Sequence, residues 1–337
     1  GTKVVFTSAA SNLVTRDRNG VTDVFLRDLL AGTTVRVSLT DADTAANGAS
    51  SVPVISGDGT KVAFASDATN LVSGDTNAKR DVFVRDLTLG TTTRISRSGA
   101  TEGNGASTRP SISDNGTVVA FETLASNLNS LGDTNGVSDV MVWTGGASVT
   151  RLSHPASLAE PNGASTRPSV RGDGLVVVFE SAASNLVSVD TNAKRDIFAI
   201  TVASPAPSRV SVDAEGRQAN GNSSQPTVSD DGKLVAFTSA AVNTRPFHVR
   251  RKRAMMSGFT SLFGAALGAG TRRANVFPRF TISTTSPFSI HAETRRKRLR
   301  RSATVAVFMI EACIMIALCQ LVGPRHVQVL RAPCASS

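Results

Sequence analysis

Residues 52–66, VPVISGDGTKVAFAS, contain two short runs of alternating apolar residues on either side of the turn sequence SGDG. Alternation with a period of two is typical of a β-strand that buries one face. Glycine accepts the positive φ angle of a tight turn, and Gly59 supplies one here. The stretch therefore predicts a β-hairpin made of residues 52–56 and 61–66.

The second strand of this hairpin recurs along the chain at a nearly constant interval of about 58 residues. The five copies read KVVFTS, KVAFAS, VVAFET, VVVFES and LVAFTS, and they are centred on Phe6, Phe64, Phe121, Phe179 and Phe237. A register kept from the first residues to residue 241 identifies a repeat protein, in which each repeat is one supersecondary unit.

Each repeat contains two further strand-like segments. In the copy around Phe64 they are DVFVRDL (81–87) and TTRIS (92–96). No segment before residue 242 shows a sustained helical period. Four short strands in every repeat predict an all-β fold, a β-propeller of four-stranded blades.

The repeat divides residues 1–241 into blades. We expect complete blades at 52–97, 109–153 and 167–212, a partial blade at 1–38 and a partial blade at 225–241. The sequence therefore predicts an incomplete propeller, an open arc of blades with exposed strand edges. The proline-rich stretch ASPAPS (203–208) is expected to form a turn between two strands.

The repeat carries a family resemblance. The run P-x-[VI]-S-x-[DN]-G-x-x-V-A-F, followed by D-V-F-V-R-D and T-R-[IV]-S, resembles the TolB-like, WD-repeat-like propeller repeats of bacterial proteins, over residues 1–241 only. This resemblance implies a bacterial protein that acts in the periplasm or outside the cell. It also implies either a scaffold that binds other molecules or an accessory propeller beside a prolyl-oligopeptidase-like hydrolase.

A long loop joins the second and third strands of each blade and carries aspartate and asparagine at fixed positions. The candidate residues are Asp17, Asn19, Asp23, Asp75, Asn77, Asp81, Asp133, Asn135, Asp139, Asp190, Asn192 and Asp196. Oxygen ligands at Asp-x-Asn spacing suit calcium, but the carboxylate that closes a helix–loop–helix calcium site is missing. The favoured reading is structural, with side chains that cap backbone N–H groups in a turn. Calcium is the alternative.

Each fourth strand contains one arginine between β-forming residues: Arg36, Arg94, Arg151 and Arg209. The four side chains are expected to pack their stems on the blade and to reach a neighbouring carboxylate. A basic ring for an acidic partner is the alternative.

The sequence gives little support to an enzyme. Residues 1–242 lack cysteine, the motif G-x-S-x-G and histidine-rich metal motifs, and their single histidine, His154, is expected in a surface loop. The chain has no tyrosine and one tryptophan, Trp143, which disfavours a sugar-binding surface. We therefore expect a non-catalytic scaffold without a cofactor, whose partner is a protein or another macromolecule.

The composition changes abruptly near residue 242. Residues 1–242 carry 20 Lys+Arg and 24 Asp+Glu, a net charge of −4, whereas residues 243–337 carry 16 Lys+Arg and 2 Asp+Glu, a net charge of +14. All three cysteines also lie in this basic tail, and the repeat stops in the middle of a blade. Such a shift marks a boundary. The favoured interpretation is that the coding frame was lost, so that the tail is non-globular and adds no strand to the propeller.

Two alternatives give the tail a role. The apolar run 303–323 is long enough to span a membrane, although Glu311 within it is unfavourable there. The basic cluster RRKRLRR (295–301) would suit nucleic acid, the less favoured of the two. The most regular structure expected in the tail is a short helix across 303–322. A membrane partner is expected only if the apolar run is genuine.

Overall fold

The computed structural model describes residues 1–15, 17–129 and 132–243 together with five short strands in the tail. It divides the chain into two compact units, Gly1–Pro246 with Ala306–Ser337, and Phe247–Val305. In the described residues every regular element is a β-strand. The expected all-β fold is confirmed.

Five antiparallel sheets follow one another along residues 1–243. The first contains β1 (Lys3–Ser8), β2 (Asp23–Asp28) and β3 (Thr33–Arg36). The second contains β4 (Ser50–Ile55), β5 (Lys61–Ser66), β6 (Asp81–Asp86) and β7 (Thr91–Arg94). The third contains β10 (Ser107–Ile112), β11 (Val119–Thr123), β12 (Asp139–Trp143) and β13 (Val149–Arg151). The fourth contains β14 (Ser165–Val170), β15 (Val176–Ser181), β16 (Asp196–Thr201) and β17 (Ser204–Arg209), and the fifth begins with β18 (Ser223–Val228) and β19 (Leu234–Ser239).

Each sheet packs face to face on the sheet that follows it in the chain. Between the first two sheets, Val24 and Leu26 of β2 meet Phe64 of β5 and Phe83 of β6 in one buried apolar cluster. The recurring phenylalanine stacks on its cross-strand neighbour, with 5.9 Å between the ring centroids of Phe64 and Phe83. Burial of these rings between sheets explains why the position recurs in every repeat.

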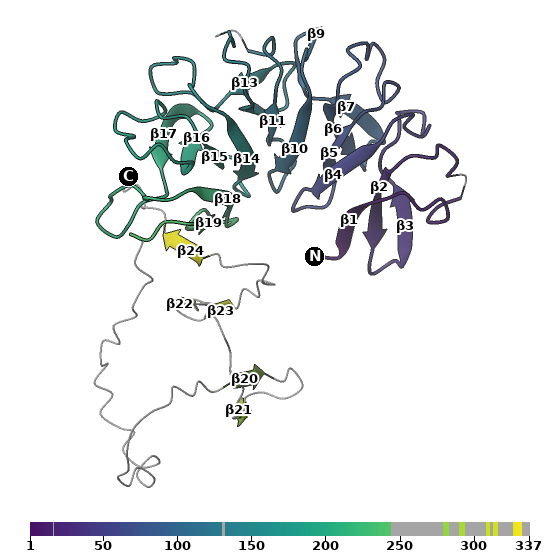
Figure 1. Cartoon of the computed structure of the whole chain (residues 1–337). Helices are drawn as coiled ribbons and strands as arrows, with labels where there is room; N and C mark the ends of the chain where they lie inside the picture. Colours follow the sequence, from purple (N-terminus) through teal and green to yellow (C-terminus); the bar gives the residue numbers. More distant parts are fainter. Residues whose placement is uncertain are drawn as a thin grey trace. The chain divides into compact units, whose positions relative to one another are not determined.

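The blades are arranged as an open arc (Figure 1). Contacts between neighbouring sheets run in chain order from β1·β4 to β14·β18, and among the described strands β1 makes no comparable contact with β18 or β19. The first strands β4, β10 and β14 lie on the inner side of the arc, and the fourth strands β7, β13 and β17 lie on its outer side. The predicted open arc is confirmed for these sheets.

Two local predictions are wrong. Ser204–Arg209, expected as a turn, is strand β17. A fourth strand has only one paired edge, so it accepts prolines that a central strand would exclude. His154, expected at the surface, is 1% exposed and its Nδ1 lies 2.8 Å from the carbonyl oxygen of Pro155. The chain turns directly after β13, where His154 N donates to Leu152 O, and the buried ring lies against the carbonyl group of Pro155. A short hairpin that the sequence did not predict, β8 (Arg97–Ser98) with β9 (Thr101–Glu102), joins the second and third sheets.

The tail contributes five described strands. β20 (Arg279–Ile282) pairs with β21 (Ile290–Glu293), and β22 (Phe308–Ile310) pairs with β23 (Cys313–Met315). β24 (His326–Arg331) pairs antiparallel with β19, so the expectation that the tail adds no strand to the propeller is wrong for these residues. The free edge of β19 offers unpaired backbone groups, which is the physical reason that a strand can add there.

The expected helix across 303–322 is also wrong where the structure describes that run, because Phe308–Ile310 and Cys313–Met315 are extended. Phenylalanine and isoleucine favour strands over helices, which accounts for the difference. Among the described residues no helix is long and apolar enough to cross a membrane. The cluster 295–301 and the rest of 303–323 lie outside the described residues.

Candidate functional site

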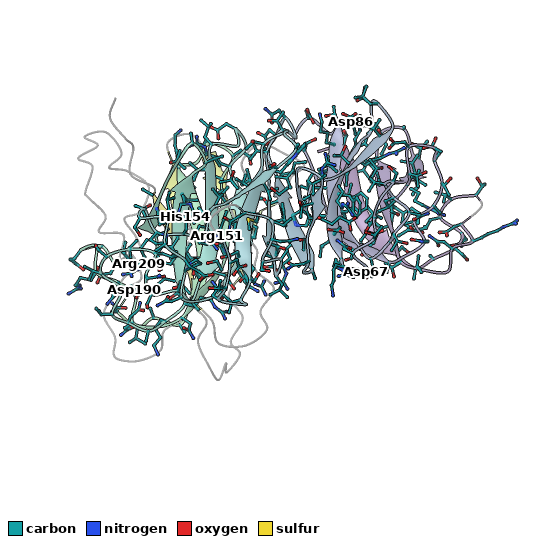
Figure 2. All side chains as sticks on the ribbon, turned by 90° about the horizontal axis from the view of Figure 1, so that it is seen from above. Asp67, Asp86, Arg151, His154, Asp190 and Arg209 are labelled. Atoms are coloured by element: carbon teal, nitrogen blue, oxygen red, sulfur yellow. The ribbon has the colours of Figure 1, made fainter. Side chains whose placement is uncertain are left out.

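The aspartate and asparagine residues of the long loops gather at one end of the sheets. Each loop leaves the second strand and enters the third, so it shares this end with the connector that leads from the fourth strand to the next sheet. In Figure 2, Asp67 at the start of one loop and Asp86 at the end of the following strand lie at opposite ends of the second sheet. The loops are therefore placed to contact the connectors.

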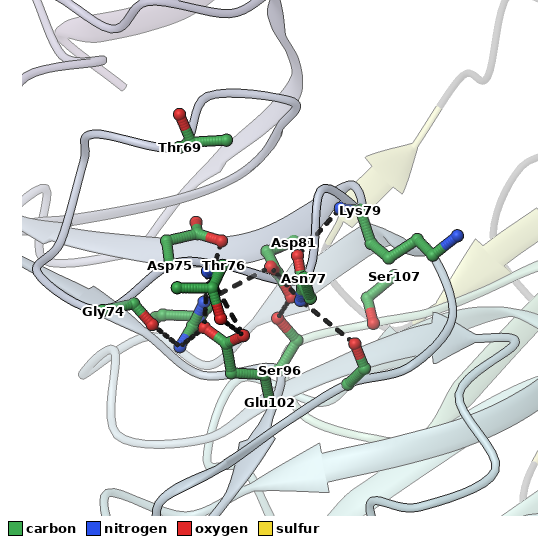
Figure 3. A network of polar contacts seen from close by, with 12 residues as sticks. Thr69, Gly74, Asp75, Thr76, Asn77, Lys79, Asp81, Ser96, Glu102 and Ser107 are labelled. Carbon is green, nitrogen blue, oxygen red and sulfur yellow. Dashed lines mark hydrogen bonds and ion pairs between the residues drawn. The ribbon is translucent and has the colours of Figure 1, made fainter.

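Asn77 joins its own loop to the next connector (Figure 3). Its Nδ2 donates to Asp81 Oδ2 at 2.9 Å and to the carbonyl oxygen of Gly103 at 3.0 Å, and its Oδ1 accepts from the backbone N–H of Lys79 at 2.8 Å. The equivalent asparagines donate to the connector carbonyls 26 or 27 residues further on: Asn19 to Ala46, Asn135 to Pro161 and Asn192 to Ala219. One amide thus fixes the shape of the loop and ties it to the chain of the next blade.

The aspartate that opens each third strand is fully buried. Asp81 accepts hydrogen bonds from Ser96 Oγ and from Asn77 Nδ2. The same serine bond recurs between Ser38 and Asp23, Ser153 and Asp139, and Ser211 and Asp196, at 2.5–2.6 Å. Burial is the main cause that raises the pKa values of Asp81, Asp139 and Asp196, and the bonded serines act against it.

A buried guanidinium lies between the loop carboxylates. Arg94 Nη1 is 3.0 Å from Asp75 Oδ1 and 3.7 Å from Asp81 Oδ2, and Arg94 Nη2 is 2.7 Å from Glu102 Oε1. The other ion pairs join Arg36 to Asp17 and Asp23, Arg151 to Asp139, and Arg209 to Asp190 and Asp196. The expected contact between each arginine and a loop carboxylate is confirmed. Because these side chains are only 1–9% exposed, they do not form an accessible basic ring.

All the candidate aspartates except Asp133 lie within ion-pair distance of an arginine of the same sheet. The candidate asparagines donate to connector carbonyls. A calcium ion held by Asp75 and Asp81 would face the positive charge of Arg94, which already lies 3.0 Å from Asp75. In the third sheet Asp133 is half-buried. Its pKa is raised chiefly by burial and to a smaller extent by the charge of Asp139. Among the described residues, no three acidic, histidine or cysteine side chains are grouped to hold a metal. The side chains of these loops fit a structural role, in turns and ion pairs, better than they fit calcium ligands. Calcium binding stays an alternative that titration can test.

Sequence reasoning missed a connector residue that completes the site in three of the four sheets. Glu102 accepts from the backbone N–H of Thr76 at 3.0 Å and from its hydroxyl at 2.8 Å. Glu160 holds Thr134 in the same way, and Gln218 holds Thr191. A polar residue recurs about 26 residues after the threonine, and this regular separation was the available signal.

From the second sheet onward, the asparagine near the start of each loop ties the loop to the preceding connector, the one that enters its own sheet. Asn70 Oδ1 accepts from the backbone N–H of Asn47 at 2.9 Å, and its Nδ2 donates to Ala45 O at 2.9 Å. The pairs Asn104–Asn127, Asn162–Asn185 and Asn220–Asn243 repeat this bond at 2.9–3.0 Å. We name the loop, its arginine and the bonded connector the blade clamp.

We expect Asn77→Ala to destabilise the chain by about 1–3 kcal/mol. The change removes two donated hydrogen bonds and the turn bond to Lys79, and it leaves the buried Asp81 with fewer donors. Urea denaturation followed by circular dichroism measures the loss. Asn12→Ala, at an exposed position of the first loop, is the control and should change the free energy of unfolding by less than about 0.5 kcal/mol. Equal effects of the two substitutions would contradict the clamp.

A second recurring feature lies on the inner strands. Val52, Arg109, Arg167 and Gln225 have positive φ angles of 46°, 50°, 54° and 57°, and a proline follows each of them. At each of these positions the first strand shifts register against the second. Positive φ is unfavourable for such residues, so the surrounding structure must hold them in place.

Two buried glutamates stabilise these bulges across blades. Glu122 Oε2 accepts from the backbone N–H of Arg167 at 3.1 Å, and Glu180 Oε2 accepts from the backbone N–H of Gln225 at 2.7 Å. Glu122 and Glu180 are 6% and 2% exposed. The side chains at the bulges differ from blade to blade, whereas the backbone and the proline are constant. We name Val52, Arg109, Arg167 and Gln225 the inner row.

Comparison with solved structures found β-propeller proteins. TolB from Acinetobacter baumannii is 16% identical with a TM-score of 0.42, and the match covers 72% of this chain and 48% of that one. A putative TolB from Agrobacterium tumefaciens is 18% identical with a TM-score of 0.40, covering 66% and 65%. The tricorn protease is 14% identical with a TM-score of 0.44, covering 72% and 22%.

The chain therefore spans about half the length of the first TolB structure and just under two thirds of the second. The expected resemblance to TolB-like propellers is confirmed, and it concerns the fold alone. No protein-family model and no curated protein sequence matches the chain.

Proposed function

We propose that this propeller is a non-catalytic scaffold that binds a protein or another macromolecule through the inner row. The inner row itself carries the proposal. The same strained backbone conformation recurs in four successive sheets, and the side chain at that position is valine, arginine, arginine and glutamine in turn. A constant frame that presents variable side chains is what a recognition surface requires.

The inner row is accessible as well as rigid. Val52 is 42% exposed, and the side chains of Arg109 and Arg167 are 47% and 39% exposed. Backbone strain of about 1–3 kcal/mol at each bulge persists only where neighbours enforce it, and such strain is common at ligand-binding positions. Bonds from Glu122 and Glu180 provide that enforcement for two of the four positions.

The buried carboxylates support a structural rather than a catalytic role for the loops. A carboxyl group with a raised pKa in a cleft is a candidate acid or base. Here Asp81 and Asp196 are fully buried, and serine, asparagine and arginine of the same blade already bind their oxygens. This supports the proposal that the propeller itself is not an enzyme.

The resemblance of the repeats to TolB-like propellers supports a proposal about where the scaffold acts. We place the scaffold in the periplasm or outside a bacterial cell. Nucleic acid is a poor partner, because residues 1–242 carry a net charge of −4. An accessory propeller beside the catalytic domain of a prolyl-oligopeptidase-like hydrolase is the alternative.

Selection from a displayed library of random peptides tests the proposal. Peptides selected on the full chain should lose at least about tenfold in affinity for the double variant Arg109→Ser, Arg167→Ser, because charged contacts contribute at about this level. Arg217→Ser is the control, since the Arg217 side chain is 68% exposed and belongs to a connector. Peptides that bind the double variant as tightly as the unchanged chain would contradict a binding role for the inner row.

A further inference from the structure

We propose that the inner side of the third and fourth sheets binds an acidic segment of a partner protein through the guanidinium groups of Arg109, Arg167 and Arg195, which we name the arginine face. The inference rests on the scaffold function proposed above, because Arg109 and Arg167 belong to the inner row, and it adds the chemistry of the partner. Arg109 lies on β10, Arg167 lies on β14, and Arg195 directly precedes β16.

The arginine face lies inside the row of sheets and not at either end of it. Strand β10 contacts β4 and β14, and β14 contacts β10 and β18, so both sheets have a neighbouring sheet on either side. Both strands lie on the inner side of the arc (Figure 1). The exposure of these arginines therefore does not come from a strand edge that another part of the chain would pair.

Two glutamates bring the three arginines together. Glu122 Oε1 lies 3.2 Å from Arg109 Nη1, and Glu122 Oε2 accepts from the backbone N–H of Arg167 at 3.1 Å. Glu180 Oε1 lies 3.4 Å from Arg167 Nε and 3.5 Å from Arg195 Nη1. One carboxylate thus contacts the first and second arginines, and the other contacts the second and third, so the three residues are successive neighbours.

Burial separates the two signs of charge. Glu122 and Glu180 are 6% and 2% exposed, whereas the side chains of Arg109, Arg167 and Arg195 are 47%, 39% and 50% exposed. The carboxylates therefore lie beneath the guanidinium groups. A molecule that approaches this face meets positive charge before it meets negative charge.

The arginines provide more positive charge than the glutamates neutralise. Three guanidinium groups against two carboxylates leave a net charge of +1 at the arginine face. Among the described residues each of the three guanidinium groups contacts only glutamate, so several of its N–H donors remain for another acceptor. Carboxylates suit these donors, because arginine binds a carboxylate through two parallel hydrogen bonds.

The backbone of the inner row does not require these charges. In the second sheet Val52 takes the place of the arginine and Ala65 that of the glutamate, yet the same bulge forms with a positive φ angle. The arginines are thus additions to the bulge, which favours a role in recognition. Since residues 1–242 carry a net charge of −4, a short segment with a few carboxylates fits the face better than a long polyanion does.

The test uses the full chain and a photoreactive peptide that carries two glutamates on each side of a benzophenone-alanine. After irradiation, mass spectrometry locates the cross-links, which we expect on β10 and β14. The double variant Arg109→Gln, Arg167→Gln should lower their yield at least about tenfold at peptide concentrations below saturation, as loss of charge-assisted hydrogen bonds does. Cross-links to the basic run 295–301 serve as an internal reference and should not change.

Four comparisons complete the experiment. A peptide with glutamine in place of glutamate should give correspondingly few cross-links on β10 and β14. Val52→Gln, at the inner-row position without an arginine, and Arg217→Gln, which removes an exposed arginine of a connector, should leave the yield unchanged. Arg195→Gln changes an exposed side chain outside the bulges, so it should lower the yield in a chain that remains folded, even if the double variant does not fold by circular dichroism.

The other outcomes overturn the proposal. Cross-links confined to parts of the chain other than β10 and β14 would place the acidic peptide elsewhere, and equal yields from the two peptides would exclude recognition of carboxylates. A loss in Arg217→Gln as large as that in Arg195→Gln would mean attraction by overall charge. If the library selection yields uncharged peptides that depend on the inner row while the acidic peptide fails, the scaffold function stands and the acidic partner is wrong.

Discussion

Arg94→Met should destabilise the chain by about 3–5 kcal/mol, the range observed when one partner of a buried ion pair is removed. Methionine keeps the apolar stem but removes the positive charge that lies near Asp75, Asp81 and Glu102. These carboxylates would then remain close together in a buried site without a cation. Urea denaturation at pH 7 measures the difference in the free energy of unfolding.

Two matched substitutions serve as controls for Arg94→Met. Arg209→Met removes a guanidinium near two aspartates, Asp190 and Asp196, where Gln218 stands in place of a third acid, so its effect should be smaller. Arg217→Met breaks ion pairs of a side chain that is 68% exposed, and it should cost less than about 1 kcal/mol. An effect of Arg94→Met no larger than that of Arg217→Met would contradict the buried arginine as the centre of the blade clamp.

The second large effect concerns pH. Burial raises the pKa of Asp75 from 3.8 to about 6. The charge of Arg94 opposes this increase, and the charges of Asp81 and Glu102 add to it. The folded chain therefore binds this proton more tightly than the unfolded chain does. The stabilising contribution is fully present below about pH 4 and is lost as the pH rises to about 6. A shift of this size corresponds to about 3 kcal/mol, since one pKa unit corresponds to about 1.4 kcal/mol.

Asp75→Asn isolates this contribution from the other carboxylates. Several of these, for example Asp28, Asp58 and Asp231, have lowered pKa values and act in the opposite direction. We therefore expect the difference in unfolding free energy, unchanged chain minus Asp75→Asn, to fall by about 2–3 kcal/mol between pH 4 and pH 7. A difference that rises over this interval, or stays constant, would mean that Asp75 does not have a raised pKa in the folded chain.

Repetition made the fold predictable. Phe64 and its four equivalents mark the second strand in every copy, and alternation around them gives the strands that the structure contains. The contact of Arg94 with a loop carboxylate was also predictable, since a buried arginine in a strand needs an acidic partner and the loop offers several. These features are local or recur at a fixed interval, so a single sequence is enough to reveal them.

Contacts between one blade and the connector of the next were not predictable in the same way. Glu102 binds Thr76 across 26 residues, and the sequence does not show that these residues meet until the curvature of the sheets is known. The positive φ angle of Arg109 depends on the bulge in β10. The proline that follows each residue of the inner row recurs in the sequence and marked where the bulges lie. His154 was assigned to a surface loop because Pro155 follows it at the end of a strand, whereas the structure buries it.

Thermal melting of the full chain with added calcium and with a chelator tests most directly whether the loops are blade clamps built around arginine. We predict coincident melting curves, because the Arg94 guanidinium lies 3.0 Å from Asp75 and already supplies the positive charge of the site. A melting temperature that falls by several degrees in chelator, with the fall absent in Asp75→Ala and Asp190→Ala, would contradict the account and show that the loops bind calcium.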